Sequence, residues 1–571
     1  MRASRLISRK HKEKPAEAQV ASHIFLLRGG YMRPVGTGIY SLLTPALRIM
    51  QKIERIIRAE MDAIGGQEIK MPVVLPRELW DESGRWDGVD NALLRFKDRV
   101  GHDMLLAMTH EEAVVALART EVTSYRDYPF MMYQIQTKFR DEARSRAGLI
   151  RVREFMMKDA YSFHTSEKDL DAYYEKCAEA YHAIFRRCGI PEVVAIQSDT
   201  GMMGGKVAHE YQLLTDAGED KVAHCPKCET YANAEVATCR FPQETGEMLP
   251  LEEFATPQIK TIEALEKFAQ VPASQMAKMV FYRTDDGKIV AVVVRGDIEV
   301  NECKLQKILR VGFAYANDDE ILGVGAVPGF ASGIGLTCRV IADPSVANGL
   351  NLICGANKPD VHLKNFNVSR DTPNAEIADV AVVAEGHACP SCGGPLQVKR
   401  GIEVGQIFKL GNRYTASMHM TYTDEKGEEQ TPVMGCYGIG VGRLAGSIIE
   451  VRHDDFGPIW PLSVAPWQVQ LNLMGADRAP ALKDAAEAIY ADLEKKGIEV
   501  LFDDRGLTAG VQFAEADLMG IPLRLIVAPK AFEQGMVEYK VRGTDEKGLI
   551  PLAEVVPFVR KWLDAEMKKY L

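Results

Sequence analysis

The sequence predicts a multidomain α+β protein, and three observations lead to this fold class. First, 571 residues at about 150 per domain suggest three or four domains, and a hydrophobic content of 46% allows each one a core. Second, strand-like stretches on both sides of a basic turn indicate a hairpin over residues 125–165. Third, strand-like and helical segments alternate from Pro466 onward, which is typical of a small α/β domain.

The first long helix is predicted over residues 44–64. Thr44 is a candidate N-cap, Pro45 fits a first helical turn, and Gly65 can end the helix in a left-handed conformation. Apolar residues recur at steps of three and four and should form one buried stripe, composed of Leu47, Met50, Ile53, Ile57 and Ile64. A short strand interrupted by prolines follows the helix.

Two further amphipathic helices are expected at 169–188 and 479–496. Between them lies a stretch of different composition, with Val/Ile-rich strands at 279–294 and a glycine-rich loop at 323–335. Strand-like sequence resumes at 402–422 and leads into a glycine cluster. The change in composition indicates an inserted domain.

Composition also excludes several classes of protein. Charged residues make up 26% of the chain, which is ordinary for a folded protein and excludes a disordered one. The strongly apolar runs are too short to span a bilayer, so we expect no membrane segment. Eleven cysteines and no apolar signal core after the basic N-terminal residues indicate a reducing compartment, the cytoplasm. A net charge of −10 argues against non-specific polyanion binding but still allows local basic patches.

One such patch lies on the predicted hairpin. Arginine side chains suit phosphates because they donate two parallel hydrogen bonds and stay charged. A solvated basic hairpin is the alternative interpretation of a charge run taken alone. The six basic residues are Lys138, Arg140, Arg144, Arg146, Arg151 and Arg153.

Motifs around this patch identify a family. FRDE at 139–142 with RVREF at 151–155 resembles motif 2 of class II aminoacyl-tRNA synthetases, and GIGVGR at 438–443 resembles motif 3. The helix before Pro72 resembles motif 1. The wider segments resemble bacterial-type prolyl-tRNA synthetases over nearly the whole chain, in the order MTHEE, YQIQTKFRDE, REFMMKDAYSFH, GIEVGQIFKLGNRY and FDDRGLTAG.

The resemblance implies an ATP site. Arg140 would hold the α-phosphate and the substrate carboxylate, and Arg443 the γ-phosphate of a bent ATP. Glu142 and Arg151 would hold the nucleotide, with Phe155 stacked on the adenine.

The resemblance also implies a proline site, in which Thr109 and Glu111 accept hydrogen bonds from the secondary ammonium of L-proline. An exposed helical carboxylate is the alternative for Glu111. Glu403 would face ATP or its Mg²⁺. The sequence departs from the family pattern at Gln406, Met108 and Lys206, and none of these departures removes a phosphate ligand.

The insertion resembles the family's editing domain, which clears alanyl-tRNA. A proline pocket cannot strongly reject alanine, because one or two missing methylenes cost only about 1–3 kcal/mol. Lys278 and His362 match residues of that domain, whereas Asn351 stands where an aspartate is expected. The glycine-rich loop lacks the usual proline. An ordinary strand lysine is the alternative for Lys278.

Two Cys-x-x-Cys pairs lie at the start and the end of the insertion, where an inserted domain must leave and rejoin its host. We therefore expect the pairs to meet. Four thiolates suit a tetrahedral structural zinc, although the gap of about 160 residues exceeds ordinary zinc-ribbon spacing. Reduced cysteines without metal are the alternative. The candidate ligands are Cys225, Cys228, Cys389 and Cys392.

The expected organisation is a class II antiparallel-sheet catalytic core in two parts, 1–222 and 397–465, an α/β editing domain at 223–396, and an α/β anticodon-binding domain at 466–571. The implied partners are tRNA(Pro), L-proline and a second copy of the chain in a homodimer. Two alternatives are a threonine or serine enzyme of the same subclass and an inactive paralogue that binds tRNA.

Overall fold

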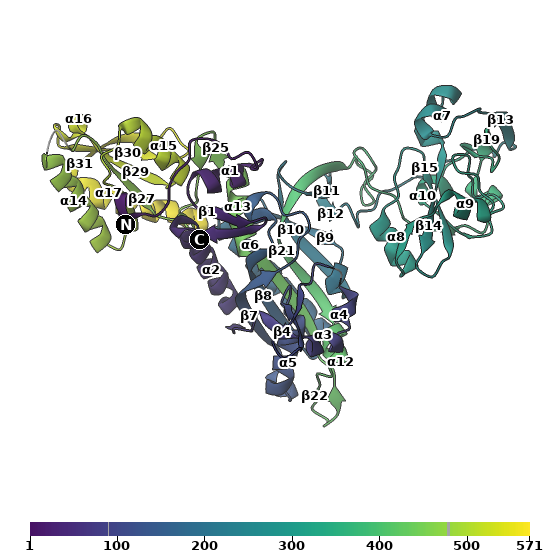
Figure 1. Cartoon of the computed structure of the whole chain (residues 1–571), viewed down its shortest axis with the longest axis horizontal. Helices are drawn as coiled ribbons and strands as arrows, with labels where there is room; N and C mark the ends of the chain where they lie inside the picture. The colour runs from purple at the N-terminus through teal and green to yellow at the C-terminus, as the bar shows by residue number, and fades with distance from the viewer. Residues whose placement is uncertain (90, 477–479) are drawn as a thin grey trace. The chain divides into compact units, whose positions relative to one another are not determined.

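The computed structural model describes residues 1–571 apart from 90 and 477–479, and it divides into two compact units (Figure 1). The first unit comprises residues 1–195, 200–219 and 401–571. The second comprises residues 196–199 and 220–400. Each unit has its own buried clusters of apolar side chains.

The first unit is built on an antiparallel sheet. Its central strands run in the order β21 (Gln397–Gly411), β24 (Val433–Gly440), β8 (Glu154–His164) and β7 (Phe130–Phe139). The short parallel strand β3 (Gly66–Glu68) pairs with β7 at the edge, and β10 (Val207–Leu214) pairs with β21. β7 and β8 form the predicted hairpin, in a register that sets Gln134 opposite Asp159.

Strand alternation divides the residues of this hairpin between two environments. Met131, Tyr133, Ile135 and Ala160 belong to the core beneath three helices, α2 (Thr44–Ala63), α6 (Glu167–Arg187) and α13 (Val441–Val451). The side chains between them on the strands, among them Lys138 and Asp159, point to the opposite face. One face of the sheet is therefore free to carry polar chemistry.

The first helix departs from its prediction in two details. Thr44 is already the first helical residue and makes no capping hydrogen bond, because Leu43 takes the cap position. Leu47 is 48% exposed, whereas Ile49, Met50 and Ile53 are buried, so the buried stripe lies further round the helix than predicted. Pro45 does occupy the first turn, and Gly65 has the expected left-handed conformation, with φ +86°.

A second core packs on the polar face of the sheet. It combines the three-stranded sheet β4 (Val74–Pro76), β6 (Asp103–Leu106) and β5 (Arg95–Lys97) with short helices. These helices are α3 (Arg77–Glu82), α4 (Arg85–Gly88), α5 (Glu111–Glu121) and α12 (Arg413–Ser417), the last of which interrupts the strand predicted over 402–422. The buried rings of Trp80 and Trp86 anchor this core, and α5 packs within it, so residues at the start of α5 lie close to the sheet.

The C-terminal part of the first unit has the predicted alternation of strands and helices. Its sheet runs in the order β28 (Val500–Asp503), β27 (Val469–Leu473), β29 (Leu523–Val527), β30 (Met536–Val541) and β31 (Lys547–Pro551). The first three of these strands are mutually parallel. The helices are α14 (Pro480–Lys495), α15 (Ala509–Met519) and α17 (Val555–Met567). The predicted start of α14 at 479 lies outside the described residues.

Among the described residues, two sheets lie entirely within the second unit. The larger has the order β16 (Phe313–Tyr315), β14 (Ala277–Thr284), β15 (Ile289–Arg295), β17 (Arg339–Ala342) and β20 (Glu376–Ile377). The smaller has the order β13 (Glu252–Ala255), β19 (Val361–Phe366) and β18 (Leu352–Gly355). Helix α7 (Ile262–Ala269) precedes β14. The predicted Val/Ile-rich strands are β14 and β15.

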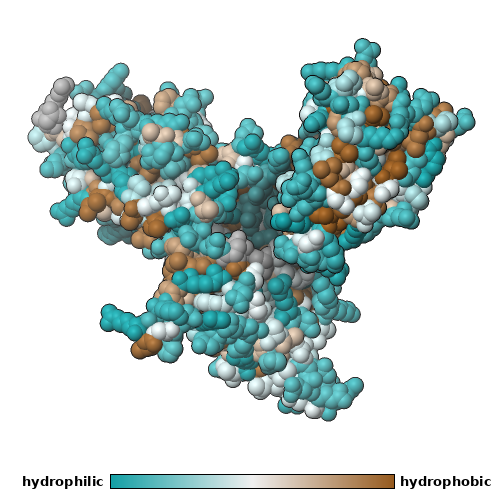
Figure 2. All heavy atoms as spheres, turned by 45° about the vertical axis from the view of Figure 1, so that its right-hand side comes forward, coloured by the Kyte–Doolittle hydropathy of each residue, from teal (hydrophilic) through white to brown (hydrophobic). Residues whose placement is uncertain are grey.

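The surface agrees with the composition. Among the described residues, no helix is both long and apolar enough to cross a membrane. On the face drawn in Figure 2, hydrophilic residues predominate and apolar residues occupy separate areas.

Candidate active site

The polar face of the first unit's sheet gathers the residues of motifs 2 and 3. Arg140 directly follows β7, and Phe155 lies on β8, with the Arg140 guanidinium carbon 5.3 Å from the centre of the Phe155 ring. Arg443 lies in the first turn of α13, directly after β24. Its Nη1 donates to Glu403 Oε2 on β21 at 3.1 Å, and its Nε donates to the carbonyl of Ile150 at 2.8 Å.

Two guanidinium groups therefore lie near one another with few compensating anions. Burial lowers the pKa of Arg140, and the positive charge of Arg443 lowers it further. Glu403 and Glu111 partly offset this effect. A pair of cations on one rigid sheet is a site prepared for a polyanionic ligand such as a nucleotide.

The turn between β7 and β8 is held by ion pairs. Arg151 donates to Glu142 at 2.9 Å and to Glu219 at 2.8 Å, and Arg146 also pairs with Glu219. Burial would raise the pKa of Glu142, but hydrogen bonds from Arg151 and the amide of Arg144 lower it below its usual value. Because Glu142 pairs with Arg151, it is not the ion-pair partner of Arg140, and Arg140 remains directed toward the sheet face.

A cluster of buried polar side chains lies at the start of α5. Thr109 and Glu111 are 5% and 1% exposed, so Glu111 is not the solvated helical carboxylate that its sequence context also allowed. The thiol of Cys436 on β24 donates to Glu111 Oε1 at 3.2 Å. Arg85 on α4 donates through Nη1 to Thr109 Oγ1 at 3.0 Å and lies 3.5 Å from Glu111 Oε2.

Sequence analysis missed Arg85 as a functional candidate. Its side chain is buried, and the guanidinium carbon lies 4.5 Å from the ring centre of Trp80. The signal was present in LWDESGRW, where an arginine stands among tryptophans that must be buried. A charge enclosed in this way requires acidic partners, and the sequence alone does not identify them.

A second missed feature is a buried polar network beneath the pocket. Lys138 Nζ lies 2.7 Å from Asp159 Oδ1 and 2.5 Å from His110 Nδ1, and His110 Nε2 donates to the carbonyl of Pro72 at 2.8 Å. Tyr161 donates to Asp159 Oδ2 at 2.8 Å and accepts from the amide of His110 at 3.2 Å. The network fixes the backbone between Thr109 and Glu111.

The protonation states in this network follow from burial and from Lys138. Burial and the neighbouring ammonium lower the pKa of His110 to about 4, so the ring is neutral and Nδ1 is free to accept a hydrogen bond. Burial alone would raise the pKa of Asp159, but Lys138, His110 and Gln134 hold it below its usual value. Asp159 is therefore the anion of the network.

Each of the three departures from the family pattern has a contact of its own in the structure. Met108 contributes its carbonyl, which accepts from Arg140 Nε at 3.4 Å, a role that does not depend on the side chain. Gln406 donates to Glu210 at 3.4 Å, and the exposed Lys206 pairs with Glu167 at 2.8 Å.

The second unit has a cavity of its own, with a volume of about 460 Å³. Lys278 on β14 and His362 on β19 both line it, and Lys278 Nζ pairs with Glu299 Oε1 at 2.6 Å. His362 Nδ1 lies 2.6 Å from Thr256 Oγ1, and burial lowers the pKa of His362. Gly329 and Ala331 of the glycine-rich loop complete part of the wall.

Asn351 lies outside this cavity wall and has a structural role. Its φ of +55° is a left-handed conformation that asparagine tolerates better than most residues. Its side chain donates to the carbonyl of Glu247 and accepts from the amide of Leu249, each at 3.0 Å. The residue that departs from the expected aspartate thus fastens one segment to another.

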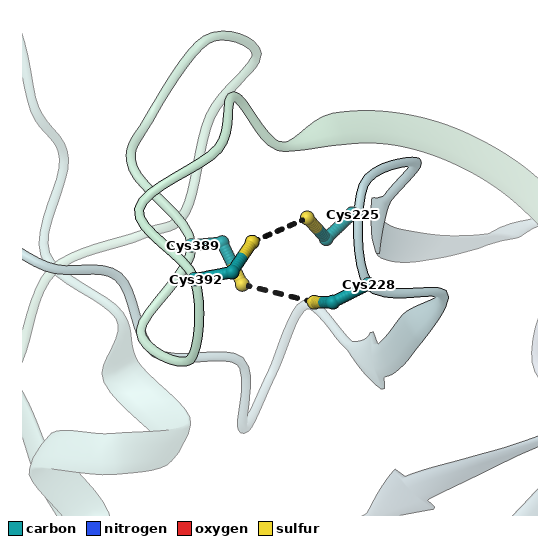
Figure 3. A group of neighbouring side chains, drawn as sticks. All are labelled: Cys225, Cys228, Cys389 and Cys392. Carbon is teal, nitrogen blue, oxygen red and sulfur yellow. Dashed lines mark hydrogen bonds between the residues drawn. The ribbon is translucent and has the colours of Figure 1, made fainter.

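The four predicted cysteines form a cluster within the second unit (Figure 3). Their sulfur atoms all lie within 4.8 Å of one another, with 3.5 Å between Cys225 and Cys392 and 3.7 Å between Cys228 and Cys389. Sulfur ligands about 2.3 Å from a tetrahedral zinc are roughly 3.8 Å apart. The donor set therefore fits such an ion.

Both cysteine pairs have the same local backbone. The amide of Glu229 donates to the carbonyl of Cys225 at 2.8 Å, and that of Gly393 to the carbonyl of Cys389 at 2.9 Å. Glu229 and Gly393 both have positive φ, +53° and +71°. Each turn folds back and presents two sulfur atoms on one side.

Comparison with known sequences identifies relatives over the whole chain. The family model for the tRNA synthetase class II core domain (G, H, P, S and T) matches residues 94–452, and that for the anticodon binding domain matches 468–562. The proline--tRNA ligase of Dehalococcoides mccartyi strain CBDB1 is 46% identical, covering 99% of this chain and all of that protein. That of Aquifex aeolicus is 43% identical and covers both chains completely.

Solved structures share the fold at low identity. A prolyl-tRNA synthetase from Giardia lamblia, in complex with prolyl-adenylate, has a TM-score of 0.58 at 15% identity, covering 97% of this chain and 82% of that one. One from Cryptosporidium parvum, complexed with L-proline and AMP, has a TM-score of 0.57 at 13% identity, covering 96% and 79%.

The neutral state of His110 gives a prediction for pH dependence. In the unfolded chain this histidine takes up a proton near its ordinary pKa of 6.5, whereas in the folded chain it does so only near 4. Stability should therefore fall as pH decreases from 6.5 toward 4. His110→Gln, which does not titrate, should lose less melting temperature than wild type between about pH 7.5 and 5. His11→Gln, at an exposed position, is the control. An equal decrease in wild type and His110→Gln would contradict the neutral state of His110.

Proposed function

Because the chain belongs to the proline--tRNA ligase family of class II synthetases, we propose that the polar face of its first unit activates proline with ATP. The observation that carries this assignment is the pair of arginines, Arg140 and Arg443, which interact across one sheet. The family reaction forms prolyl-adenylate and then transfers proline to the 3′ end of tRNA(Pro). Both arginines are retained, which disfavours an inactive tRNA-binding paralogue.

Adenylate formation needs alignment and charge neutralisation more than a base. The proline carboxylate is already ionised at neutral pH, so it can attack the α-phosphorus directly while pyrophosphate leaves. Arg140 holds this carboxylate and the α-phosphate, and Arg443 binds the γ-phosphate. The charge that builds on the phosphorus oxygens meets fixed guanidinium groups, which need no reorganisation during the reaction.

The remaining nucleotide contacts follow the same geometry. Phe155 stacks on the adenine, while Glu142 and Arg151, already paired, hold the nucleotide at the turn. Glu403 is the carboxylate beside Arg443 and would face ATP or its Mg²⁺. Bound Mg²⁺ supplies additional positive charge at the phosphates.

Thr109 and Glu111 form the amino-acid pocket. Their oxygens accept from the secondary ammonium of proline, and the buried Glu111 carboxylate supplies the opposite charge. After activation, the terminal ribose hydroxyl of tRNA(Pro) attacks the prolyl carbonyl and releases AMP. The C-terminal α/β part, 466–571, binds the anticodon.

The second unit is an editing domain that hydrolyses alanyl-tRNA(Pro). Its cavity of about 460 Å³ lies within the range of small-ligand sites, and Lys278 and His362 offer polar groups at its wall. The compact clustering of residues 220–400 supports treating this segment as one inserted domain. Its substrate is tRNA(Pro) charged with alanine, the amino acid that the proline pocket cannot strongly reject.

The cysteine cluster binds one structural zinc ion. Cys225, Cys228, Cys389 and Cys392 supply four sulfur ligands, and the two backbone turns already aim them at a common point. Metal binding of this kind adds directly to folding free energy.

The chain forms a homodimer and works in the cytoplasm. Strand β3 ends the sheet at an edge, and Leu47 on α2 and Val74 on β4 are exposed apolar side chains in the region that resembles motif 1. Eleven free thiols fit a reducing compartment.

Replacing either phosphate-facing arginine should nearly abolish adenylate formation. Arg140→Ala and Arg443→Ala each remove a charge aimed at the reacting phosphates, and proline-dependent ATP–pyrophosphate exchange should fall by roughly 100-fold or more. Arg146→Ala, on the same hairpin but 58% exposed at its side chain, is the matched control and should retain most activity. Exchange within tenfold of wild type for either variant, with the fold intact, would remove the assignment.

Lys278→Ala should separate editing from activation. Proline-dependent exchange should be unchanged, whereas hydrolysis of alanyl-tRNA(Pro) should slow because the cavity loses its ammonium group. Lys288→Ala, at the exposed turn of the same β14–β15 hairpin, is the control. Equal deacylation rates for the Lys278 variant and wild type would defeat the role of Lys278. No deacylation by either would defeat the editing function itself.

Protein purified without chelators should contain close to one zinc per chain. Cys389→Ser should lose most of the metal and become protease-sensitive near 220–230 and 385–395, because the two turns are no longer held together. Cys303→Ser, outside the cluster, should keep the metal. Metal-free wild-type protein with unchanged proteolysis in Cys389→Ser would exclude a zinc site.

Light scattering at micromolar concentration should give twice the chain mass of 63.3 kDa. Leu47→Asp, which places a charge on the exposed apolar side of α2, should shift the mass toward one chain. A wild-type mass of 63.3 kDa would show that the protein is a monomer.

A further inference from the structure

The proline pocket contains a buried charge arrangement that the proposed mechanism does not use. Arg85 Nη1 donates to Glu112 Oε1 at 3.0 Å, to Thr109 Oγ1 at 3.0 Å, and lies 3.5 Å from Glu111 Oε2. All four side chains are at most 5% exposed. One guanidinium thus stands between two adjacent carboxylates, in a place where solvent does not screen them.

Two adjacent buried carboxylates cannot both stay ionised without a cation. Burial raises the pKa of Glu112, while Arg85 acts in the opposite direction. Ser83 Oγ also donates to Glu112 Oε1, at 2.7 Å. Arg85 and Glu112 therefore form a matched pair, and the Glu111 carboxylate lies 3.5 Å from the same guanidinium.

Other charged groups lie around this arrangement, and the charges of Glu111 and Arg85 also act on Arg140. Lys138 and Asp159 lie below as a pair of opposite charges, and Arg140 faces the phosphate side. Burial raises the pKa of the Cys436 thiol and of the Tyr414 hydroxyl, so both groups are neutral at physiological pH. Arg85 is the cation that contacts Thr109 and Glu111 directly.

We propose that Arg85 is a positioning and specificity-determining residue, which holds the Glu111 carboxylate and fixes the Thr109 hydroxyl so that the pocket accepts one cationic amine. This inference rests on the proposed roles of Thr109 and Glu111 as proline ligands. The hydrogen bond from Arg85 occupies one lone pair of Thr109 Oγ1, and the other remains available to the substrate.

The proposal predicts what happens when the charges are changed singly and together. Arg85→Met leaves two carboxylates that share a proton, and this proton competes with the ammonium of proline. Glu112→Gln leaves Arg85 to neutralise Glu111. Each variant should raise the KM for proline by roughly tenfold or more. The double variant Arg85→Met/Glu112→Gln restores a single carboxylate and should recover part of the lost affinity.

The pH profile separates this role from packing. In Arg85→Met the KM for proline should fall as pH rises from about 6 to 8.5, because the shared proton leaves and the ammonium of proline stays charged. Wild type, the double variant and Arg85→Lys should show a flat KM over this range. Arg119→Met is the control. Arg119 lies further along α5 and pairs with Glu82, so this variant should keep the wild-type KM.

Exchange assays on purified full-length variants decide between the outcomes. A pH-dependent KM in Arg85→Met together with recovery in the double variant supports the proposal. A pH-independent rise in Arg85→Met, or a double variant no better than either single one, would overturn it. If Arg85→Met does not fold, Glu112→Gln and Arg85→Lys decide, because an unchanged KM in Glu112→Gln also contradicts the charge balance.

Glu111→Gln distinguishes failure of this inference from failure of the proposed proline site. An unchanged KM for proline in Glu111→Gln would show that the pocket itself is misassigned. A raised KM in Glu111→Gln without recovery in the double variant would leave the proline site standing and exclude only the role of Arg85.

Discussion

The ion pair between Lys138 and Asp159 is the interaction on which the first unit's site depends. Both side chains are buried, and the pairing of β7 with β8 brings them to the same face of the sheet. Loss of one partner from such a pair costs about 3–5 kcal/mol, because the other charge remains buried. Strand alternation then places Arg140, two residues after Lys138, and Phe155, four before Asp159, on that face too. The charge that the fold must compensate and the charge that we propose to bind substrate are thus set by one register.

Several charged side chains of this site are buried, and partners from distant parts of the chain compensate their charges. His110 is neutral because burial and the ammonium of Lys138 lower its pKa, and its position fixes Thr109 and Glu111 on either side. Arg85 compensates Glu112, and Arg443 is held by Glu403 and a carbonyl. Such an arrangement costs desolvation, but it holds substrate-binding groups without reorganisation, which is what electrostatic catalysis requires. The apolar core on the other face of the sheet supplies the rigidity.

The second unit shows how a domain can carry separate chemistry within the same chain. It has its own buried clusters, its own cavity and its own cysteine site, all formed by residues of 220–400. One departure from the family pattern has a structural role there. Asn351 accepts a left-handed backbone and links two segments, and it lies away from the cavity wall. Lys278 and His362 keep their places at that wall.

Much of this protein is determined by local sequence: the 3.6-residue period of α2 and α6, the hairpin of β7 and β8, and the order of the motifs. The spacing of cysteines also indicated a common site. Tertiary structure alone decided which charges meet. Cys436 contacts Glu111, which is 325 positions away in the sequence, and Arg85 pairs with Glu112, which is 27 positions away. No local sequence pattern encodes these contacts. Tertiary packing also decided which face of α2 is buried, and it leaves Leu47 exposed, contrary to the prediction. The reason is physical. Sequence periodicity specifies approximately which face of a helix or strand is buried. The partner of a buried ion is determined by non-local packing, because leaving a buried charge unpaired costs too much free energy.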